Sequence, residues 1–314
     1  MFSSTRPDGQ DPKLRKWTNQ PFSRLYQSKF DESGHVIEVA PLRGSFEPNG
    51  YQSTATFTSD GKVMYFTQSQ SLSKEQMKSD PTMRLKLVRA ELMENGEWGN
   101  FKDLSLNGIT FSSAHPALSA DESKLYFASD RPGGLGNSDF WYSVILGDSI
   151  SAEPVNLGAK VNTAGRDTFP FITAEDILYF SSDSYAGMGG LDIYNIVLND
   201  FNKGVTQLSQ PINRPMDDFG FVYDQSHGTG YFSSNRNGTD SQGDEIFRFK
   251  SVCKILLNGN VHDKETGDDI SGAFVQIFNG DNSVIHEFVL GQDALFSFEH
   301  KCDEDLRIVA SAPA

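Results

Sequence analysis

The chain has 314 residues, a formal net charge of −15 and only two cysteines, and this length allows two domains. So acidic a chain is not expected to bind nucleic acid, because the phosphate backbone is bound by a basic face. No apolar run reaches the roughly 18 residues that a membrane-spanning helix needs, so no direct membrane span is expected. The aromatic content of 12% suits a packed all-β protein, because aromatic side chains fit the pleated surface of a sheet.

The first expected strands are marked by a Tyr-Phe pair that recurs about every 50 to 60 residues. The pairs begin at Tyr65, Tyr126, Tyr179 and Tyr231. A partial fifth copy lies at 2–6, where Phe-Ser-Ser-Thr-Arg matches Phe-Ser-Ser-Asn-Arg at 232–236. Self-similarity at such a period is typical of repeat architectures, so the first 250 residues are predicted to be one repeat array.

Each copy predicts four short strands. An apolar run is followed by a turn, the Tyr-Phe strand, a Gly-rich loop such as 131–136, a third strand and a weaker fourth. The segment Lys124–Asp130 is apolar on both faces, and such a sheet must be covered on both sides. Stacked propeller blades provide that cover, so we expect a β-propeller over 1–250 with about five four-stranded blades.

The number of blades in the intact ring is left open. The first copy lacks its first strand and the last copy lacks its last, so the N-terminal blade is expected to be truncated and six blades are possible. We therefore expect the chain to be a fragment of a longer protein.

The residues 253–314 predict a second domain. Alternating strands are expected at 255–261, 273–278, 286–290, 295–299 and 306–310, separated by polar turns. This pattern is typical of a small antiparallel β-sandwich. Cys253 opens the first of these strands and Cys302 follows a later one, so the two are candidates for one disulfide. A disulfide would imply an oxidising compartment, and two free buried thiols are the alternative.

No catalytic, cofactor or metal site is predicted. The six histidines form no close pair of the zinc-binding type, and no Gly-x-Ser-x-Gly nucleophile turn occurs. The Gly-rich stretch 187–190 lies between two strands and not before a helix, so it is read as a hairpin loop and not as a nucleotide cradle.

Three repeated acids, Asp139, Asp192 and Glu245, open the third strand of their repeats. One interpretation is a ring of cation ligands. The other, which we favour because repetition follows the fold, is that each carboxylate accepts backbone amides of the Gly-rich loop and fixes the hairpin. The tryptophans Trp17, Trp98 and Trp141 also have two interpretations, as anchors for a partner or as packing between blades.

Two strings identify a family resemblance. The sequence Leu-Tyr-Phe-Ala-Ser-Asp-Arg-Pro-Gly-Gly at 125–134 resembles the WD40-like propeller repeats of the TolB type. The sequence Gly-Gly-Leu-Asp-Ile-Tyr at 189–194 resembles OmpA-family envelope proteins of the Bacteroidetes, PorE-like components of type IX secretion and gliding among them. The segments 258–263 and 271–275 resemble the carboxypeptidase-regulatory-like sandwich that follows the propeller in those proteins.

This resemblance implies a non-catalytic protein-interaction scaffold on the periplasmic side of the outer membrane. Its expected partners are other envelope proteins, and peptidoglycan would be bound only through an OmpA-like domain outside this chain. No cofactor is implied. Two alternatives stay open, a substrate-gating propeller of a peptidase and a glycan-binding propeller.

Overall fold

The computed structural model describes residues 1–6, 22–31, 35–47, 50–71, 75, 82–151, 153–237, 243–252, 254–302 and 305–312. It confirms the all-β fold class, since the strands in this part of the chain are accompanied by little more than a three-residue 3-10 helix, η1 (Phe201–Lys203). The chain divides into two compact units, residues 1–224 with 230–249, and residues 225–229 with 250–314. We describe each unit by itself.

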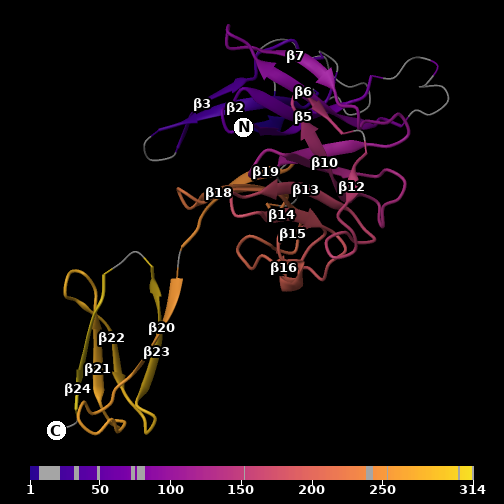
Figure 1. The fold of residues 1–314 in the computed structure, drawn as a ribbon. Helices are drawn as coiled ribbons and strands as arrows, with labels where there is room; N and C mark the ends of the chain where they lie inside the picture. Colours follow the sequence, from indigo (N-terminus) through magenta and orange to yellow (C-terminus); the bar gives the residue numbers. More distant parts are fainter. Residues whose placement is uncertain are drawn as a thin grey trace. The chain divides into compact units, whose positions relative to one another are not determined.

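The first unit contains five antiparallel sheets that follow one another along the chain (Figure 1). The first two sheets contain β1 (Phe2–Ser4), β2 (Arg24–Phe30) and β3 (Val36–Pro41), then β4 (Gln52–Phe57), β5 (Val63–Ser69), β6 (Leu85–Leu92) and β7 (Trp98–Asp103). The third contains β8 (Ser113–Leu118), β9 (Lys124–Ser129), β10 (Asp139–Leu146), β11 (Ser149–Ile150) and β12 (Val155–Asn156). The fourth and fifth contain β13 (Asp167–Ile172), β14 (Ile177–Ser182), β15 (Asp192–Val197) and β16 (Thr206–Gln207), then β17 (Asp218–Asp224), β18 (Thr229–Ser234) and β19 (Glu245–Lys250).

The Tyr-Phe strands are the second strands of their sheets and carry the core of this unit. Phe66, Phe127 and Phe180 are completely buried, on β5, β9 and β14. Residues on both faces of these strands are covered, as the burial of Leu125 together with Tyr126 shows. Each buried aromatic or aliphatic side chain contributes roughly 1.5–3 kcal/mol, so the repeat places its strongest stabilisation where two sheets meet.

The first strands of successive sheets lie side by side. β4 contacts β8, β8 contacts β13, and β13 contacts β17. We call these four the inner strands. Three of them carry a bulge at the same place, because the pairing register shifts between Ser53 and Ala55, between Ala114 and Ala117, and between Thr168 and Phe171. A bulge bends and twists its strand locally, so the same bend recurs in each sheet.

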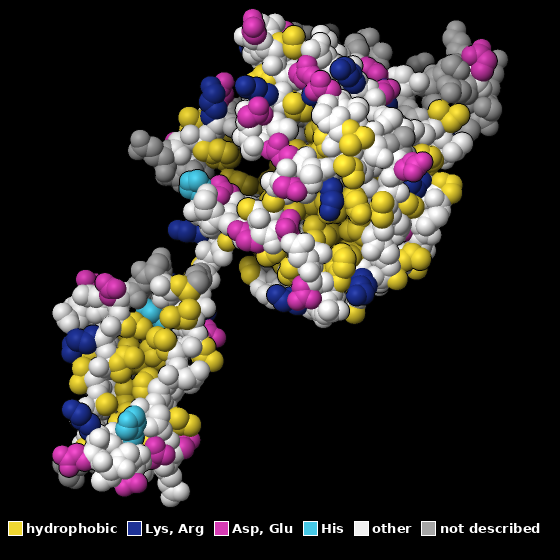
Figure 2. Space-filling model, in the orientation of Figure 1, with side chains coloured by type: hydrophobic (Ala, Val, Ile, Leu, Met, Phe, Trp, Pro, Cys, Tyr) yellow, Lys and Arg dark blue, Asp and Glu magenta, His cyan; other side chains and the backbone are white. Residues whose placement is uncertain are grey.

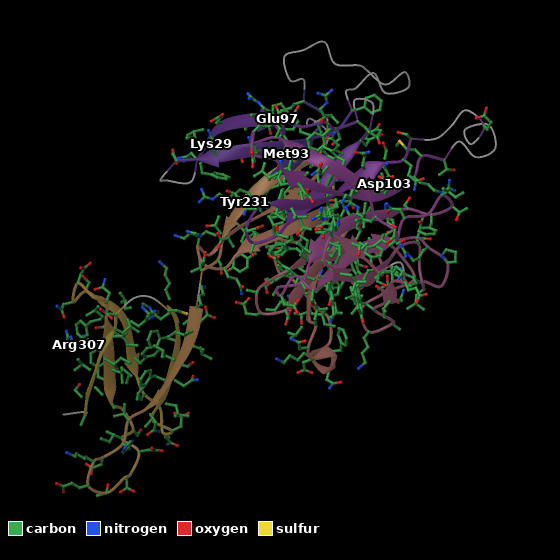
Figure 3. The ribbon with its side chains drawn as sticks, turned by 45° about the horizontal axis from the view of Figure 1, so that its top comes forward. Lys29, Met93, Glu97, Asp103, Tyr231 and Arg307 are labelled. Atoms are coloured by element: carbon green, nitrogen blue, oxygen red, sulfur yellow. The ribbon has the colours of Figure 1, made fainter. Side chains whose placement is uncertain are left out.

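The succession of sheets returns on itself. The ring of Phe30 on β2 lies 6.0 Å from the ring of Tyr231 on β18, which brings the first sheet beside the fifth. Figure 3 shows Tyr231 near Lys29, the residue before Phe30. In the described residues the first and fifth sheets have three strands each. The blade count of an intact ring therefore stays a prediction.

The second unit is a small two-sheet sandwich. One sheet pairs β20 (Lys254–Asn260) with β23 (Leu295–Lys301), and the other has the order β22 (Val284–Val289), β21 (Phe274–Phe278) and β24 (Arg307–Ser311). Val275, Ile277 and Phe298 form its core. Apolar side chains also remain exposed on this unit, and Figure 2 shows them gathered between charged ends.

Candidate functional site

Two of the predicted acids hold the loop that precedes them. Asp139 is 1% exposed and accepts hydrogen bonds from the backbone amides of Leu135, at 2.6 Å, and Gly136, at 3.0 Å. Asp192, also 1% exposed, accepts from the amides of Met188, at 2.7 Å, and Gly189, at 2.9 Å. Each carboxylate therefore satisfies donors of its own Gly-rich loop at the start of the third strand.

Asp139 and Asp192 differ in their contact with the last strand of the sheet, β12 and β16 respectively. Asn156 on β12 donates from Nδ2 to Asp139 Oδ2 at 2.9 Å. Gln207 stands at the corresponding place on β16, opposite Tyr194 as Asn156 is opposite Trp141. Its Nε2 and the Oδ1 of Asp192 are both buried without a hydrogen-bond partner among the described residues. The longer Gln207 side chain thus does not repeat the bond that Asn156 makes.

Glu245 does not match the other two acids. It is exposed, and the partner that the structure gives it is the Nδ2 of Asn237. The loop residues 238–242 before it lie outside the described part. Within the residues that the structure describes, no group of three or more His, Cys, Asp or Glu side chains is placed to hold a metal ion.

The structure describes one of the two cysteines of the predicted disulfide. Cys302 is disulfide-bonded. Cys253 lies outside the described residues, so the pairing of the two stays a prediction. Trp98 and Trp141 are buried and pack within the first unit, and Trp17 also lies outside the described residues.

A set of buried polar residues at the start of the inner strands was missed from the sequence. Asp218 opens β17, is completely buried, accepts from the amide of Arg214 at 2.7 Å and forms an ion pair with Arg236. Asp167 opens β13 and accepts from the amide and hydroxyl of Thr163 at 2.6 and 3.1 Å. Burial raises the pKa of Asp167. The signal was present, since both carboxylates lie near the start of the apolar run of their repeats.

In the third sheet, Arg131 corresponds to Arg236, but a serine takes the place of the buried carboxylate of Asp218. Ser113 opens β8, and its Oγ accepts from Arg131 Nη2 at 2.9 Å. Arg131 also donates to the carbonyl of Leu106, at 3.1 Å, and its guanidinium lies 4.9 Å from the ring centre of Phe127 and 5.4 Å from that of Trp141. Burial lowers the pKa of Arg131 to about 10, so the group stays charged at neutral pH.

The bulges of the inner strands carry the most distinctive side chains of this unit. His115 and Phe169 adopt left-handed backbone, with φ of 55° and 54°. Gly220 stands at the same place in β17, with φ of 65°. A side chain with positive φ is strained, and such strain persists where the surroundings or a function require it. The bulge residues therefore mark the candidate functional site.

Aromatic side chains at these bulges or next to them contact one another across three sheets. The rings of His115 and Phe169 have centres 4.0 Å apart, and Phe169 lies 4.9 Å from the ring of Phe219 on β17. On the other side, Thr54 Oγ1 on β4 lies 3.1 Å from His115 Nδ1. The side chains form a continuous row over four inner strands, and we call Thr54, His115, Phe169 and Phe219 the bulge row.

The imidazole of His115 has one bound and one open nitrogen. Nδ1 faces Thr54, while Nε2 has no hydrogen-bond partner among the described residues and is not enclosed. The backbone amide of His115 donates to Thr67 Oγ1 at 2.8 Å. Burial lowers the pKa of His115 to about 4, so the ring is neutral at pH 7 and Nε2 can exchange a hydrogen bond with a partner.

Comparison with known proteins adds little beyond the arrangement of strands. No family model and no curated protein matches the chain. A putative TolB from Agrobacterium tumefaciens has a TM-score of 0.46 at 10% identity, over 88% of this chain and 90% of that one. TolB from Acinetobacter baumannii gives 0.43 at 13%, over 93% and 63%. A puromycin-hydrolysing peptidase of Mycobacterium tuberculosis gives 0.36 at 12%, over 76% and 43%.

These TM-scores lie below 0.5 and carry no argument about activity or partner. The all-β assignment rests on the chain's own strands and sheets. No helix among the described residues has the length and apolar character needed to cross a membrane.

Proposed function

We propose that this chain is a non-catalytic binding module of a bacterial cell envelope, and that the bulge row contacts a partner protein. The observation that carries the proposal is the pair of left-handed residues, His115 and Phe169, held at the same place on neighbouring inner strands. Their aromatic rings are half-buried, which leaves part of each ring accessible. Aromatic anchors of this kind contribute strongly to protein interfaces.

The side chains of the bulge row can form hydrogen bonds and aromatic contacts with a partner, but these four residues do not form a complete catalytic arrangement such as a nucleophile, a base and a carboxylate. Its polar side-chain groups are the hydroxyl of Thr54 and the imidazole of His115. The neutral imidazole has its Nδ1 directed at a threonine hydroxyl, so it can bind a donor or acceptor of a partner through Nε2.

The finer proposal follows the sequence resemblance. We infer a place on the periplasmic side of the outer membrane, in an OmpA-family protein linked to type IX secretion or gliding. The partners are then other envelope proteins, and peptidoglycan would be bound through a separate domain. The strings at 125–134 and 189–194 support this proposal.

A capture experiment tests the proposal. The chain is immobilised, exposed to an envelope extract of a Bacteroidetes bacterium, and the bound proteins are quantified by mass spectrometry. Phe169→Gly removes one ring of the row and copies the residue that β17 carries at Gly220. We expect at least a tenfold loss of the main captured protein, with the far-UV spectrum and melting temperature preserved.

Leu146→Ser is the matched control, because Leu146 is exposed at the end of β10 and is not part of the row. It should leave capture unchanged. Capture that survives Phe169→Gly, or binding of saccharides in place of proteins, would contradict the proposal. Recovery of secretion or gliding components would support the finer assignment, and recovery of unrelated proteins would remove it.

A further inference from the structure

A groove lies between the third and fourth sheets, and no residue of the bulge row lines it. It has a volume of about 480 Å³ and is lined by the turn before β9, the strands β9, β10 and β12, the turn before β14, and the segment 198–201. A volume of this size is within the range of sites that accept small ligands or single side chains. The lining contains aromatic rings, two carboxylates and two amides, so it is suited to a polar ligand with a flat or apolar part.

Two tyrosines of the third sheet line this groove. Tyr126 on β9 and Tyr142 on β10 have ring centres 5.5 Å apart. Tyr126 is only 7% exposed, yet no described residue hydrogen-bonds its hydroxyl, and that oxygen is not enclosed. The hydroxyl of a buried side chain therefore opens into the groove without a protein partner. A buried polar group in this position gains from a ligand that supplies the missing hydrogen bond.

Two carboxylates line the groove, one from the third sheet's turn and one from the fourth's. Asp121 belongs to the turn before β9, where it accepts from the Oγ of Ser119 at 2.6 Å. Asp176 belongs to the turn before β14 and accepts from Nδ2 of Asn199 at 2.7 Å. Lys124 is the one cation of the lining, and its Nζ lies 5.2 Å from the ring centre of Tyr142. The groove therefore keeps a net negative charge.

The pKa of the Tyr126 hydroxyl reflects both burial and this negative charge. Burial and, to a smaller extent, the neighbouring Tyr142, Asp176 and Asp121 in that order together raise the pKa of Tyr126 to about 12. The position where a ligand would meet the hydroxyl is thus one that disfavours additional negative charge. Burial, the largest of these causes, opposes charge of either sign, so the preference for a cation over a carboxylate or phosphate rests on the net negative charge of the lining.

We propose that this groove binds the guanidinium group of an arginine carried by an extended segment of the partner protein. The planar guanidinium can donate to Asp176 and to the Tyr126 hydroxyl while it stacks against an aromatic ring. A lysine ammonium would meet the charge but not the flat aromatic lining. The inference rests on the proposed binding function and names the chemistry of its partner.

A peptide titration tests this directly. The probe is an acetylated and amidated Gly-Ser-Arg-Ser-Gly peptide, and its neutral match carries citrulline in place of arginine. Binding to the full chain is followed by NMR of tyrosine ring signals at low ionic strength. We expect millimolar binding of the arginine peptide, at least tenfold weaker binding of the citrulline peptide, and loss of affinity as salt is added.

Substitutions of groove residues test whether the arginine peptide binds at this site. Asp176→Asn keeps the side-chain shape and tolerates the positive φ of 57°, and should weaken arginine-peptide binding at least tenfold. Tyr126→Phe should weaken it about threefold with the melting temperature preserved. Glu175→Gln is the matched control, because Glu175 lies in the same turn, is exposed and does not line the groove.

Equal affinity for both peptides, or affinity that Asp176→Asn leaves unchanged, would overturn the inference. Binding of an N-acetylglucosamine trimer with no response to the arginine peptide would also overturn it and favour a glycan site. These failures differ from failure of the proposed function. If a partner is captured through the bulge row and Asp176→Asn does not weaken its capture, only the arginine site is removed. If the unmodified chain captures no protein at all, the binding function is removed.

Discussion

The third and fifth sheets of the first unit carry the same framework with different charges. In both, an arginine after the Tyr-Phe strand donates from Nε to a serine of that strand at 3.0 Å, Arg131 to Ser129 and Arg236 to Ser234. In the fifth sheet the guanidinium also meets the buried carboxylate of Asp218. In the third sheet that place is taken by Ser113.

The difference shows which part of the repeat is fixed and which part varies. The aromatic surroundings are kept, since each guanidinium lies less than 5 Å from the Phe of its Tyr-Phe pair, at 4.9 Å for Arg131 and 4.7 Å for Arg236. The charge balance is not kept. The bulge residue varies as well, from His115 in the third sheet to Gly220 in the fifth. Backbone and core packing thus define the repeat, while individual sheets differ in the polar groups available for recognition.

The largest expected effect comes from breaking the ion pair of the fifth sheet. Asp218→Ala leaves Arg236 largely buried without its carboxylate, and loss of one partner of a buried pair costs about 3–5 kcal/mol. The matched change in the third sheet, Ser113→Ala, removes one hydrogen bond and should cost about 1 kcal/mol. Urea unfolding of both variants measures the two costs, and equal costs would show that the pair does not distinguish the sheets.

The second expected effect is a pH dependence that belongs to the third sheet. Burial lowers the pKa of His115 from 6.5 to about 4, so between these values the unfolded chain binds a proton that the folded chain does not. Stability should therefore fall as pH drops from about 6.5 to about 4, by up to about 3 kcal/mol. Carboxylates also titrate in this pH range. The measured quantity is therefore the difference in the pH dependence of stability between the wild type and a His115 variant.

His115→Gly, which copies the residue of the fifth sheet, should lack this part of the slope. Urea unfolding of the wild type and the variant at pH 7 and pH 4.5 gives the comparison. Parallel stability curves for the two proteins would mean that His115 is protonated in the folded state as readily as in water.

The third expected effect concerns the loop acids of the two sheets. Asp139→Ala leaves the amides of Leu135 and Gly136 without their acceptor, and hydrogen bonds to a charged group are worth about 1.5–3 kcal/mol. Glu245→Ala removes an exposed side chain and should cost less than about 0.5 kcal/mol. Thermal unfolding followed by circular dichroism orders the two, and the reverse order would show that Glu245 holds its loop through residues outside the described part.

The smallest expected effect comes from a substitution that makes the third sheet resemble the fifth. Ser113→Asp places a carboxylate beside Arg131, and a charge-assisted hydrogen bond of this kind should raise stability by about 1–2 kcal/mol. The same substitution with Arg131→Met should lose the gain. A double-mutant cycle with no coupling between the two positions would contradict the assigned geometry.

Much of the fold could be predicted because the motif that repeats in the sequence, the Tyr-Phe strand, also supplies the most buried side chains. The Tyr-Phe strands of the second, third and fourth sheets bury Phe66, Phe127 and Phe180 completely, and burial of that kind depends mainly on local pattern. The loop acids Asp139 and Asp192 could be picked out because an acid recurs at the first position of the third strand in these repeats. Glu245 shares the position and not the contact, since pattern alone does not fix the distance to the loop amides.

The candidate site was harder to find because its members are far apart in sequence. Thr54, His115, Phe169 and Phe219 come together only through the packing of four inner strands. One signal was available, since His115 and Phe169 are each followed by proline, Pro116 and Pro170. Proline inside a strand marks a bulge or an edge, and that placement in two consecutive repeats indicates special backbone.

The bulge row as a partner-binding surface is tested most directly by hydrogen–deuterium exchange of the chain with and without its captured partner. We expect binding to slow exchange in peptides that contain His115 and Phe169, on β8 and β13. Protection confined to the sandwich, with unchanged exchange in both of those strands, would contradict it.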